Sequence, residues 1–477
     1  MSFWSDARVR EALEPLSAPT PLALDFSGVA TDTRSLSTAA LFVALRGERF
    51  DAHDFLERAV AAGAAGAVVD HVPAGAPAIP YYVVADTLVA LGRLARLYRR
   101  HLSARVCAIT GSNGKTTTKE LTRAALATRF RTHATAGNLN NLVGAPLTLL
   151  ATPPDAEVVV VELGTNAPGE VARLGAIAEP DACIVTGIAE EHLEGLGDLE
   201  GVLREETSIL LALPRSGFAV VSDDPPALAQ RARELRGDGA RTLAAGWSEH
   251  ADPALRAEDV RIAADGHVAF RWQGRDVRLS LPARHNARNA LLALGVAVEW
   301  GADPDRAAEA LTSVRAGTMR GEVAVYGELM LLVDCYNSNP SSLRAAVDTL
   351  EAMPRRGGRV AVVGTMLELG PRSAEIHGDA AVALARSGLD LVVATGDFYE
   401  ALEPFAISMG ERLVRVHDPL EAMPVLEARL RGDEIVLLKG SRGVALERLL
   451  PLMQARWGRA SETTSPGGGA AAARGGD

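Results

Sequence analysis

Hydrophobic and polar positions follow two distinct periods through the middle of the chain. Between residues 100 and 185, short and almost continuously apolar runs are separated by stretches in which apolar residues have helical spacing. Such runs are typical of strands buried on both faces, and the helices between them predict a mostly parallel sheet. The predicted strands span 104–110, 156–164 and 181–188, with helices over 117–127 and 286–300.

The same pattern recurs on both sides of this unit. After Arg320, predicted strands and one helix lie at 329–336, 341–353, 359–365, 389–396 and 433–440. The first hundred residues contain a smaller series, with strands at 41–47 and 66–70 and a helix around 54–62. The sequence therefore predicts an α/β fold with three domains.

The expected domain boundaries follow from these series. We expect a small N-terminal α/β domain over residues 1–100, a central domain with a mostly parallel sheet over 101–317 and a C-terminal Rossmann-like α/β domain over 318–460. Residues 461–477 are rich in Gly, Ala and Ser and have almost nothing to bury, so we expect a disordered tail.

Composition and charge narrow the class of protein. The formal net charge of −11 argues against nucleic-acid and membrane-surface partners, which normally face a basic surface. No run reaches the roughly 20 apolar residues of a membrane span, and the charged N-terminus does not resemble a secretion signal. Three scattered cysteines show no metal-binding spacing and are expected to be reduced. We expect a cytoplasmic protein without membrane insertion.

The segment GSNGKTTT, which begins at Gly111, carries the clearest chemistry. The common phosphate-loop spacing G-x-x-x-x-G-K-[ST] would require a glycine where the chain has Ile109. Gly111 and Gly114 still let the backbone turn its N–H groups towards an anion, at the start of a helix. Lys115 offers a charge for phosphates, and Thr116 a hydroxyl for Mg²⁺. The alternative is a glycine-containing turn with a chance lysine, which the position between a buried strand and a helix disfavours.

Family resemblance explains the shorter spacing. AITGSNGKTTTKE resembles the ATP loop of the Mur ligases and their folylpolyglutamate synthase relatives, which carry T-G-[ST]-x-G-K-[ST]. Segments similar to this family follow in the same order, at 137–150, 159–171, 187–202 and 284–294. Segments 30–36, 41–55, 334–350, 366–370 and 439–443 resemble the branch that joins D-alanyl-D-alanine to UDP-N-acetylmuramoyl-tripeptide. The resemblance covers about residues 20 to 450.

The resemblance implies a set of site residues. The ATP-binding residues would be Gly111, Ser112, Asn113, Gly114, Lys115, Thr116 and Thr117, with Asn286 and Asn289 at the adenine and Asp334 at the ribose. Thr116 and Glu162 would hold a first Mg²⁺ and His192 a second, while Arg320 would approach the γ-phosphate. Substrate contacts would come from Asp32, Thr33 and Arg34 at the UDP end, from Asn138, and from Asn337, Asn339, Ser441 and Arg442 at the dipeptide. Taken singly, each also fits a surface charge or a turn former.

Three positions depart from the family pattern, and one of them is Thr365, where the branch tends to carry an acidic residue before M-L-E-L-G. The family carries a lysine, carbamylated by CO₂, where this chain has Glu206. Both groups end in two anionic oxygens that suit Mg²⁺, although glutamate reaches about 4 Å less far. We hypothesise that Glu206 replaces the carbamate without CO₂; the alternative is that this role is lost. Ala283 stands where the family often has glycine.

The resemblance also implies the reaction. The terminal carboxylate of the tripeptide would attack ATP to form an acyl phosphate, which the amine of D-alanyl-D-alanine would then attack. ATP and Mg²⁺ would be required, domain closure would exclude water, and we expect a monomer. The alternatives are the sister ligase that adds the third amino acid to UDP-N-acetylmuramoyl-dipeptide, and an inactive nucleotide-binding paralogue. Folylpolyglutamate synthase lacks the UDP-sugar module and is disfavoured.

Overall fold

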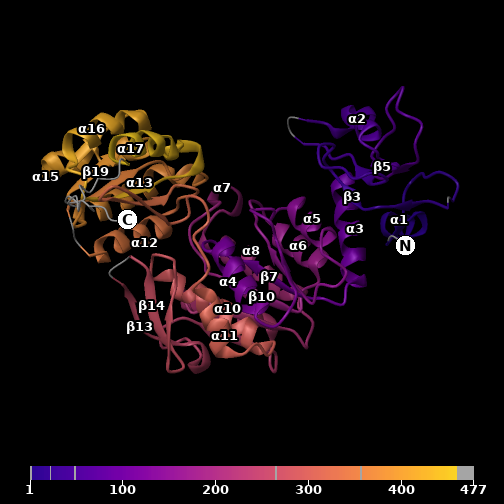
Figure 1. The fold of residues 1–477 in the computed structure, drawn as a ribbon, viewed down its shortest axis with the longest axis horizontal. Helices are drawn as coiled ribbons and strands as arrows, with labels where there is room; N and C mark the ends of the chain where they lie inside the picture. The colour runs from indigo at the N-terminus through magenta and orange to yellow at the C-terminus, as the bar shows by residue number, and fades with distance from the viewer. Residues whose placement is uncertain (1–2, 22, 48–49, 264–265, 355–356, 459–477) are drawn as a thin grey trace, which may run out of the picture. The chain divides into compact units, whose positions relative to one another are not determined.

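The chain contains two compact units (Figure 1). The computed structural model describes residues 3–21, 23–47, 50–263, 266–354 and 357–458, so the expected disordered tail lies outside the described residues. The first unit comprises residues 1–317, 339–345 and 367–376, and the second comprises 318–338, 346–366 and 377–477.

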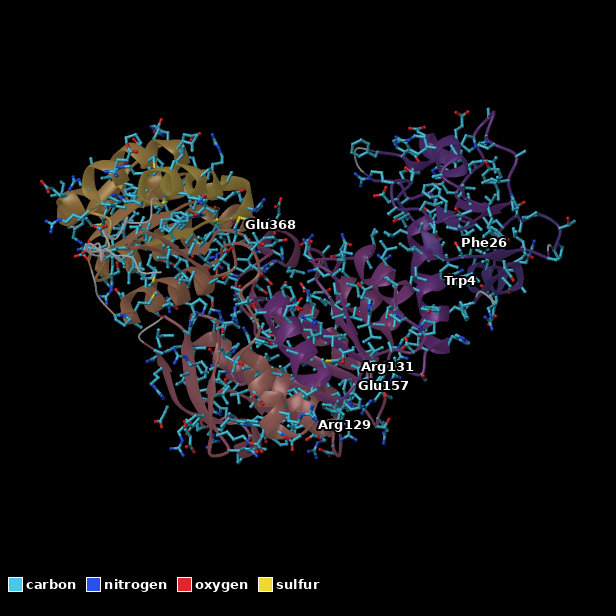
Figure 2. All side chains as sticks on the ribbon, viewed as in Figure 1. Trp4, Phe26, Arg129, Arg131, Glu157 and Glu368 are labelled. Carbon is cyan, nitrogen blue, oxygen red and sulfur yellow. The ribbon has the colours of Figure 1, made fainter. Side chains whose placement is uncertain are left out.

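The first unit begins with a small four-stranded parallel sheet in the order β3-β4-β5-β6. Its strands are β3 (Val29–Ala30), β4 (Leu41–Val43), β5 (Gly66–Val69) and β6 (Tyr81–Val83). Around it lie α1 (Asp6–Leu13), the 3₁₀ helix η1 (Ala52–Phe55), α2 (Leu56–Ala61) and α3 (Thr87–His101). The antiparallel pair β1 (Trp4–Ser5) and β2 (Asp25–Phe26) brings Trp4 opposite Phe26, both labelled in Figure 2. The predicted N-terminal α/β series is confirmed.

Helix α3 belongs to a core that continues into the central domain. Its N-terminus is capped by Asp86, whose carboxylate accepts hydrogen bonds from the amides of Leu88 and Val89. Leu91 and Leu94 on its apolar face are fully buried, and each such burial contributes about 2 kcal/mol. The same core cluster includes residues of β4 and β5 as well as residues of the central sheet.

The central domain is built on a six-stranded parallel sheet in the order β12-β11-β10-β7-β9-β8. Its strands are β7 (Arg105–Thr110), β8 (Thr132–Ala134), β9 (Val158–Glu162), β10 (Ala182–Val185), β11 (Phe218–Ser222) and β12 (Thr242–Ala245). The connecting helices are α4 (Lys115–Ala127), α5 (Gly144–Leu150), α6 (Glu170–Ala178), α7 (Leu193–Leu196), α8 (Leu199–Thr207), η2 (Ser208–Ala212) and α9 (Pro226–Arg236). The mostly parallel sheet predicted from the apolar runs is confirmed.

Both faces of this sheet are covered, because alternate residues of its strands enter different cores. Val106 and Val159 pack with α3 and α6, whereas Cys107 and Val160 pack with α4 and the helix α10 (His285–Glu299). The second core also contains α11 (Pro304–Leu311) and an antiparallel meander that was not predicted, preceded by η3 (Pro253–Leu255). The meander strands are β13 (Ala257–Ile262), β14 (Val268–Trp272) and β15 (Arg275–Arg278).

The second unit contains a six-stranded sheet in the order β16-β17-β21-β18-β19-β20. All neighbours are parallel except β16, which pairs antiparallel with β17. The strands are β16 (Glu322–Tyr326), β17 (Leu329–Asp334), β18 (Arg359–Val363), β19 (Leu391–Ala394), β20 (Leu413–Arg415) and β21 (Ile435–Lys439). Five parallel strands confirm the predicted Rossmann-like pattern.

Two of the helices described after Asp334 are long, with 13 and 14 residues, and the others are short. The α-helices are α12 (Pro340–Ala352), α13 (Ser373–Arg386), α14 (Asp397–Ala401), α15 (Ala406–Met409), α16 (Ala422–Arg429) and α17 (Leu449–Trp457). The 3₁₀ helices are η4 (Gly370–Arg372), η5 (Glu403–Phe405), η6 (Gly410–Arg412), η7 (Pro419–Glu421), η8 (Arg442–Val444) and η9 (Leu446–Arg448). Among the described residues, no helix combines the length and apolar character needed to cross a bilayer. The three cysteines are buried and unpaired, as expected.

Candidate nucleotide and metal site

The loop between β7 and α4 requires glycine at two positions. Gly111 has φ of 121°, and a Cβ atom there would lie 2.7 Å from the backbone nitrogen of Thr186. Gly114 caps α4 with φ of 83°, and its Cβ would lie 2.8 Å from the side-chain amide of Asn289. A side chain at either position would combine backbone strain with a collision. The two glycines singled out from the sequence are therefore fixed by geometry.

Lys115 is the first residue of α4, and its ammonium group lies over the loop. Its Nζ atom donates hydrogen bonds to the carbonyl oxygens of Gly111 (2.6 Å) and Ser112 (3.2 Å). It also lies 3.6 Å from Oε1 of Glu191. The N-terminus of α4 adds free backbone N–H groups at the same place. A cation, exposed amides and two tight glycine turns together form a site suited to phosphate.

Hydrogen bonds fasten this loop to the segment that follows β10. The amide of Ser112 donates to the carbonyl of Gly187, and the amide of Ala189 donates to Oγ of Ser112, both over 2.9 Å. The hydroxyl of Thr186 donates to the carbonyl of Asn113 over 2.6 Å. His192 follows directly, in a left-handed conformation with φ of 52° that begins α7. The loop and the predicted histidine ligand are thus held close together, although they are distant in sequence.

Glu162 ends β9 with its side chain buried. Its Oε1 atom accepts hydrogen bonds from the hydroxyl of Thr116 (3.0 Å) and the side-chain amide of Asn140 (2.9 Å). Its Oε2 atom is buried without a hydrogen bond and lies 3.8 Å from Nζ of Lys119. A buried carboxylate oxygen that lacks a hydrogen bond, beside a hydroxyl, fits the oxygen ligands that Mg²⁺ prefers. The geometry is therefore compatible with the expected Mg²⁺ ligands Thr116 and Glu162.

Glu191 was not singled out from the sequence, yet it is the most buried of the glutamates beside His192. Its Oε1 atom also lacks a hydrogen bond. Burial raises the pKa of the Glu191 carboxyl, and the charges of Lys115 and His192 oppose that rise only in part. Glu190 and Glu194, which look equivalent in the sequence, are half-buried and exposed. The three glutamates therefore differ in burial because of the tertiary contacts of this segment, which the sequence alone does not show.

Glu206 lies in α8, buried against the start of the phosphate loop. Its Oε2 atom accepts hydrogen bonds from the amide of Gly111 over 2.9 Å and from the hydroxyl of Thr110. Glu206 and Glu191 are close enough for each charge to affect the other. The carboxylate therefore lies at the start of the phosphate loop, and one of its oxygens is already occupied by the loop.

The two residues predicted to contact adenine lie near the start of α10. Asn286 donates from its side chain to the carbonyl of Pro282 (2.6 Å), and Asn289 donates to Oδ1 of Asn286 (2.9 Å). Both are buried, and Asn289 is the side chain that closes on Gly114. Ala283 has φ of 66°, which explains why glycine suits this position.

The remaining predicted residues are dispersed among several elements. Thr117 is half-buried in α4, Asn138 is exposed before α5, and Asn339 is buried, with Oδ1 accepting from the amide of Ser342 at the start of α12. At the N-terminal sheet, Arg34 donates three side-chain hydrogen bonds to Asp32 and lowers the pKa of Asp32 to about 2, while Thr33 lies between them in the chain.

Five predicted residues belong to the second unit: Arg320, Asp334, Asn337, Ser441 and Arg442. Asp334 and Lys439 end neighbouring strands, and their side chains form an ion pair of 3.2 Å. Nζ of Lys439 also donates to the carbonyl of Asn337. The guanidinium of Arg320 stacks on the ring of Tyr336 at 3.7 Å. Arg442 lies 3.6 Å from Glu447, and the amide of Ser441 donates to the carbonyl of Thr365.

Lysine is rare in this chain. Of 49 Lys and Arg residues, three are lysines: Lys115 and Lys119 lie in the first part of α4, and Lys439 ends β21. Their side chains are exposed by 15% at Lys115 and by 1% at Lys119 and Lys439. Arginine supplies every other basic side chain. The compact ammonium group is therefore confined to buried or partly buried positions beside carboxylates and carbonyl oxygens.

Models of known protein families match three successive parts of the chain. Family models match residues 25–99 (Mur ligase family, catalytic domain), 109–297 (Mur ligase middle domain) and 319–442 (Mur ligase, glutamate ligase domain). The chain belongs to the Mur ligase family. This confirms the family resemblance and the three-domain α/β architecture.

Both a curated protein sequence and solved structures are similar to this Mur ligase. The UDP-N-acetylmuramoyl-tripeptide–D-alanyl-D-alanine ligase of Bacillus subtilis (strain 168) is 36% identical over 431 residues, which cover 89% of this chain and 92% of that protein. A crystal structure of MurF from Acinetobacter baumannii matches with a TM-score of 0.86 and 29% identity, covering 95% of this chain and 99% of that one. MurF from Thermotoga maritima, solved in complex with ADP, matches with a TM-score of 0.79 and 27% identity, covering 90% and 97%.

Proposed function

We propose that this Mur ligase joins D-alanyl-D-alanine to UDP-N-acetylmuramoyl-tripeptide, with ATP converted to ADP and phosphate. The observation that carries the proposal is the 36% identity to a ligase of that name, which extends over 89% of the chain and includes the N-terminal domain. The structure of a MurF in complex with ADP supports the nucleotide. We propose the cytoplasm as the place of the reaction, as expected from the sequence.

The chemistry requires an activated carboxylate. The terminal carboxylate oxygen of the tripeptide forms a bond to the γ-phosphorus of ATP as the bond to the bridging oxygen breaks, and ADP leaves. The amine of the dipeptide then forms a bond to the acyl carbon, phosphate leaves, and the amine loses a proton. Because anions attack or surround anions in the first step, catalysis is mainly charge neutralisation and positioning.

The loop residues supply the positive side of this arrangement. Lys115 and the amides of Asn113 to Thr117 bind the β- and γ-phosphates, in the cradle that the glycine turns create. Asn286 and Asn289 lie at the adenine end, next to Gly114. The family resemblance assigns contacts with the ribose to Asp334 and with the γ-phosphate to Arg320, two residues of the second unit.

Thr116 and Glu162 would hold one Mg²⁺, and His192 a second, with Glu206 beside it. When bound, the metal ions supply positive charge that offsets the phosphate and carboxylate anions. The buried Oε2 of Glu162, which lacks a hydrogen bond, is the feature of this chain that fits the first ion. Glu191 likewise has a buried carboxylate oxygen without a hydrogen bond, and this oxygen lies 3.6 Å from Nζ of Lys115.

Mass spectrometry of the products tests the assignment. Incubation with UDP-tripeptide, ATP, Mg²⁺ and D-alanyl-D-alanine should give UDP-pentapeptide, and ATP hydrolysis should rise only when both acceptor and dipeptide are present. Lys115→Ala is the control for a reaction at this loop. Product from UDP-dipeptide and a free amino acid would instead establish the sister ligase, and no turnover with either pair would establish an inactive paralogue.

A further inference from the structure

A cluster of charged and imidazole side chains lies at the carboxyl edge of the N-terminal sheet. Arg46 follows β4, Asp70 and His71 follow β5, and Asp51 and His53 come from the start of η1. The carboxyl edge of parallel strands is where α/β folds place their ligands. None of these five residues takes part in the ATP reaction derived above.

The donor atoms of three side chains converge within this cluster. Nitrogen atoms of His53 and His71 and a carboxylate oxygen of Asp70 all lie within 4.8 Å of one another. Oδ1 of Asp70 is 3.2 Å from Nε2 of His53 and 2.5 Å from Nδ1 of His71. The two imidazole rings stack with centroids 4.6 Å apart and an interplanar angle of 22°. Ligands of a tetrahedral Zn²⁺ lie about 3.3 Å apart for bonds of about 2.0 Å, so a small rotation of His71 suffices.

The contacts of His53 fix the orientation and the protonated nitrogen of its ring, as in a metal-binding histidine. Its ring is 2% exposed, and Nδ1 lies 2.6 Å from Oδ1 of Asp51. Nε2 accepts a hydrogen bond of 3.2 Å from the amide of Asp70, so the ring proton is on Nδ1 and is donated to Asp51. A carboxylate that holds the far nitrogen of a histidine is the usual outer partner of a metal-binding imidazole.

Arg46 forms ion pairs with both carboxylates of the cluster, those of Asp51 and Asp70. Its Nε lies 2.9 Å from Oδ2 of Asp51, and its Nη1 lies 3.4 Å from Oδ2 of Asp70. The Oδ1 atoms of both aspartates face the imidazoles. Nη2 of Arg46 also donates to Oδ1 of Asp70 over 3.5 Å, so the guanidinium fixes the orientation of both carboxylates, and Oδ1 of Asp70 contacts the guanidinium as well as the two imidazoles.

We propose that His53, Asp70 and His71 form a binding site for a divalent transition metal of the Zn²⁺ class, with Asp51 as the outer partner of His53. Two imidazoles and one carboxylate suit Zn²⁺ and leave one position for a water or another oxygen ligand. Binding displaces the proton between Nδ1 of His71 and Asp70, and the amide of Asp70 exchanges its bond to His53 for water.

Calorimetric titration of the full, chelator-treated chain with Zn²⁺ tests this site. His71→Ala is the main variant, because the side chain is 52% exposed and its loss should not affect folding. The matched control is His250→Ala, an exposed histidine outside the cluster. We expect the tightest Zn²⁺ binding event to be unchanged in the control and weakened at least tenfold in His71→Ala and Asp70→Asn. Asp51→Asn should weaken it by roughly 10- to 100-fold, the usual effect of losing an outer partner.

Two further measurements separate the site from other metal binding. Mg²⁺ prefers all-oxygen sites, so its titration should be the same in all variants. Co²⁺ bound at the site should give visible absorption bands that disappear in His71→Ala. Identical Zn²⁺ isotherms for the unmodified chain and His71→Ala, with both melting at the same temperature, would overturn the proposal.

Discussion

Lys119 and Glu162 place two opposite charges 3.8 Å apart, each with a side-chain exposure of 1%. Removal of one partner from a buried pair leaves the other without compensation, which typically costs roughly 3–5 kcal/mol. We therefore expect Lys119→Met to lower the free energy of unfolding by about 3 kcal/mol. The double variant Lys119→Met/Glu162→Gln should recover much of that loss, as urea unfolding would show. Additive losses in the double variant would contradict a coupled pair.

A second prediction at the residue scale concerns Glu206. Its carboxylate already provides an anion beside the loop without a carbamate, because it accepts from the amide of Gly111. Ligase activity of the unmodified chain should therefore not change when bicarbonate is removed. Glu206→Lys should make activity depend on bicarbonate, as carbamylation would restore the family's group. A strong bicarbonate requirement in the unmodified chain is the result that rules out the hypothesis.

At the scale of an element, two helices begin with the same glycine geometry in different surroundings. Gly114 caps α4 at φ 83°, and Gly169 caps α6 at φ 85°. A Cβ at Gly114 would meet Asn289, whereas a Cβ at Gly169 has nothing within 4 Å. Both Ala variants should lose about 1–2 kcal/mol through backbone strain, and Gly114→Ala should lose more because of the collision with Asn289. ATP affinity, measured by calorimetry, should fall only in Gly114→Ala; an equal fall in both would refute the role of the Gly114–Asn289 contact.

Some elements could be predicted from the pattern of apolar residues, and others could not. The strands around the loop were predictable because their residues are buried on both faces, as at Val106 and Cys107. The meander β13–β15 was not, because strands such as Ala257–Ile262 expose charged side chains and lack a continuous apolar run. For the site, the glycine and lysine pattern sufficed for the loop. Glu191 could not be identified from the sequence, because its burial depends on tertiary contacts between the loop and the segment after β10.

For the whole molecule, the contacts divide into two units, and we expect each to unfold as a cooperative body. Leu94→Ala removes a fully buried side chain from the first unit and should destabilise that unit by roughly 2–5 kcal/mol. Leu426→Ala, equally buried, should do the same to the second. Scanning calorimetry should show two transitions, of which each variant moves one. A single transition shifted by both would contradict two cooperative bodies.

The scarcity of lysine has a practical consequence for labelling. Reagents that acylate primary amines find almost no targets on a surface whose basic groups are guanidinium, and burial shields two of the three lysines. Coupling should therefore concentrate on the terminal amine and, more slowly, on the partly accessible Lys115. Bound nucleotide should suppress the second of these, so peptide mapping of a dye-labelled sample would report occupancy of the phosphate loop directly.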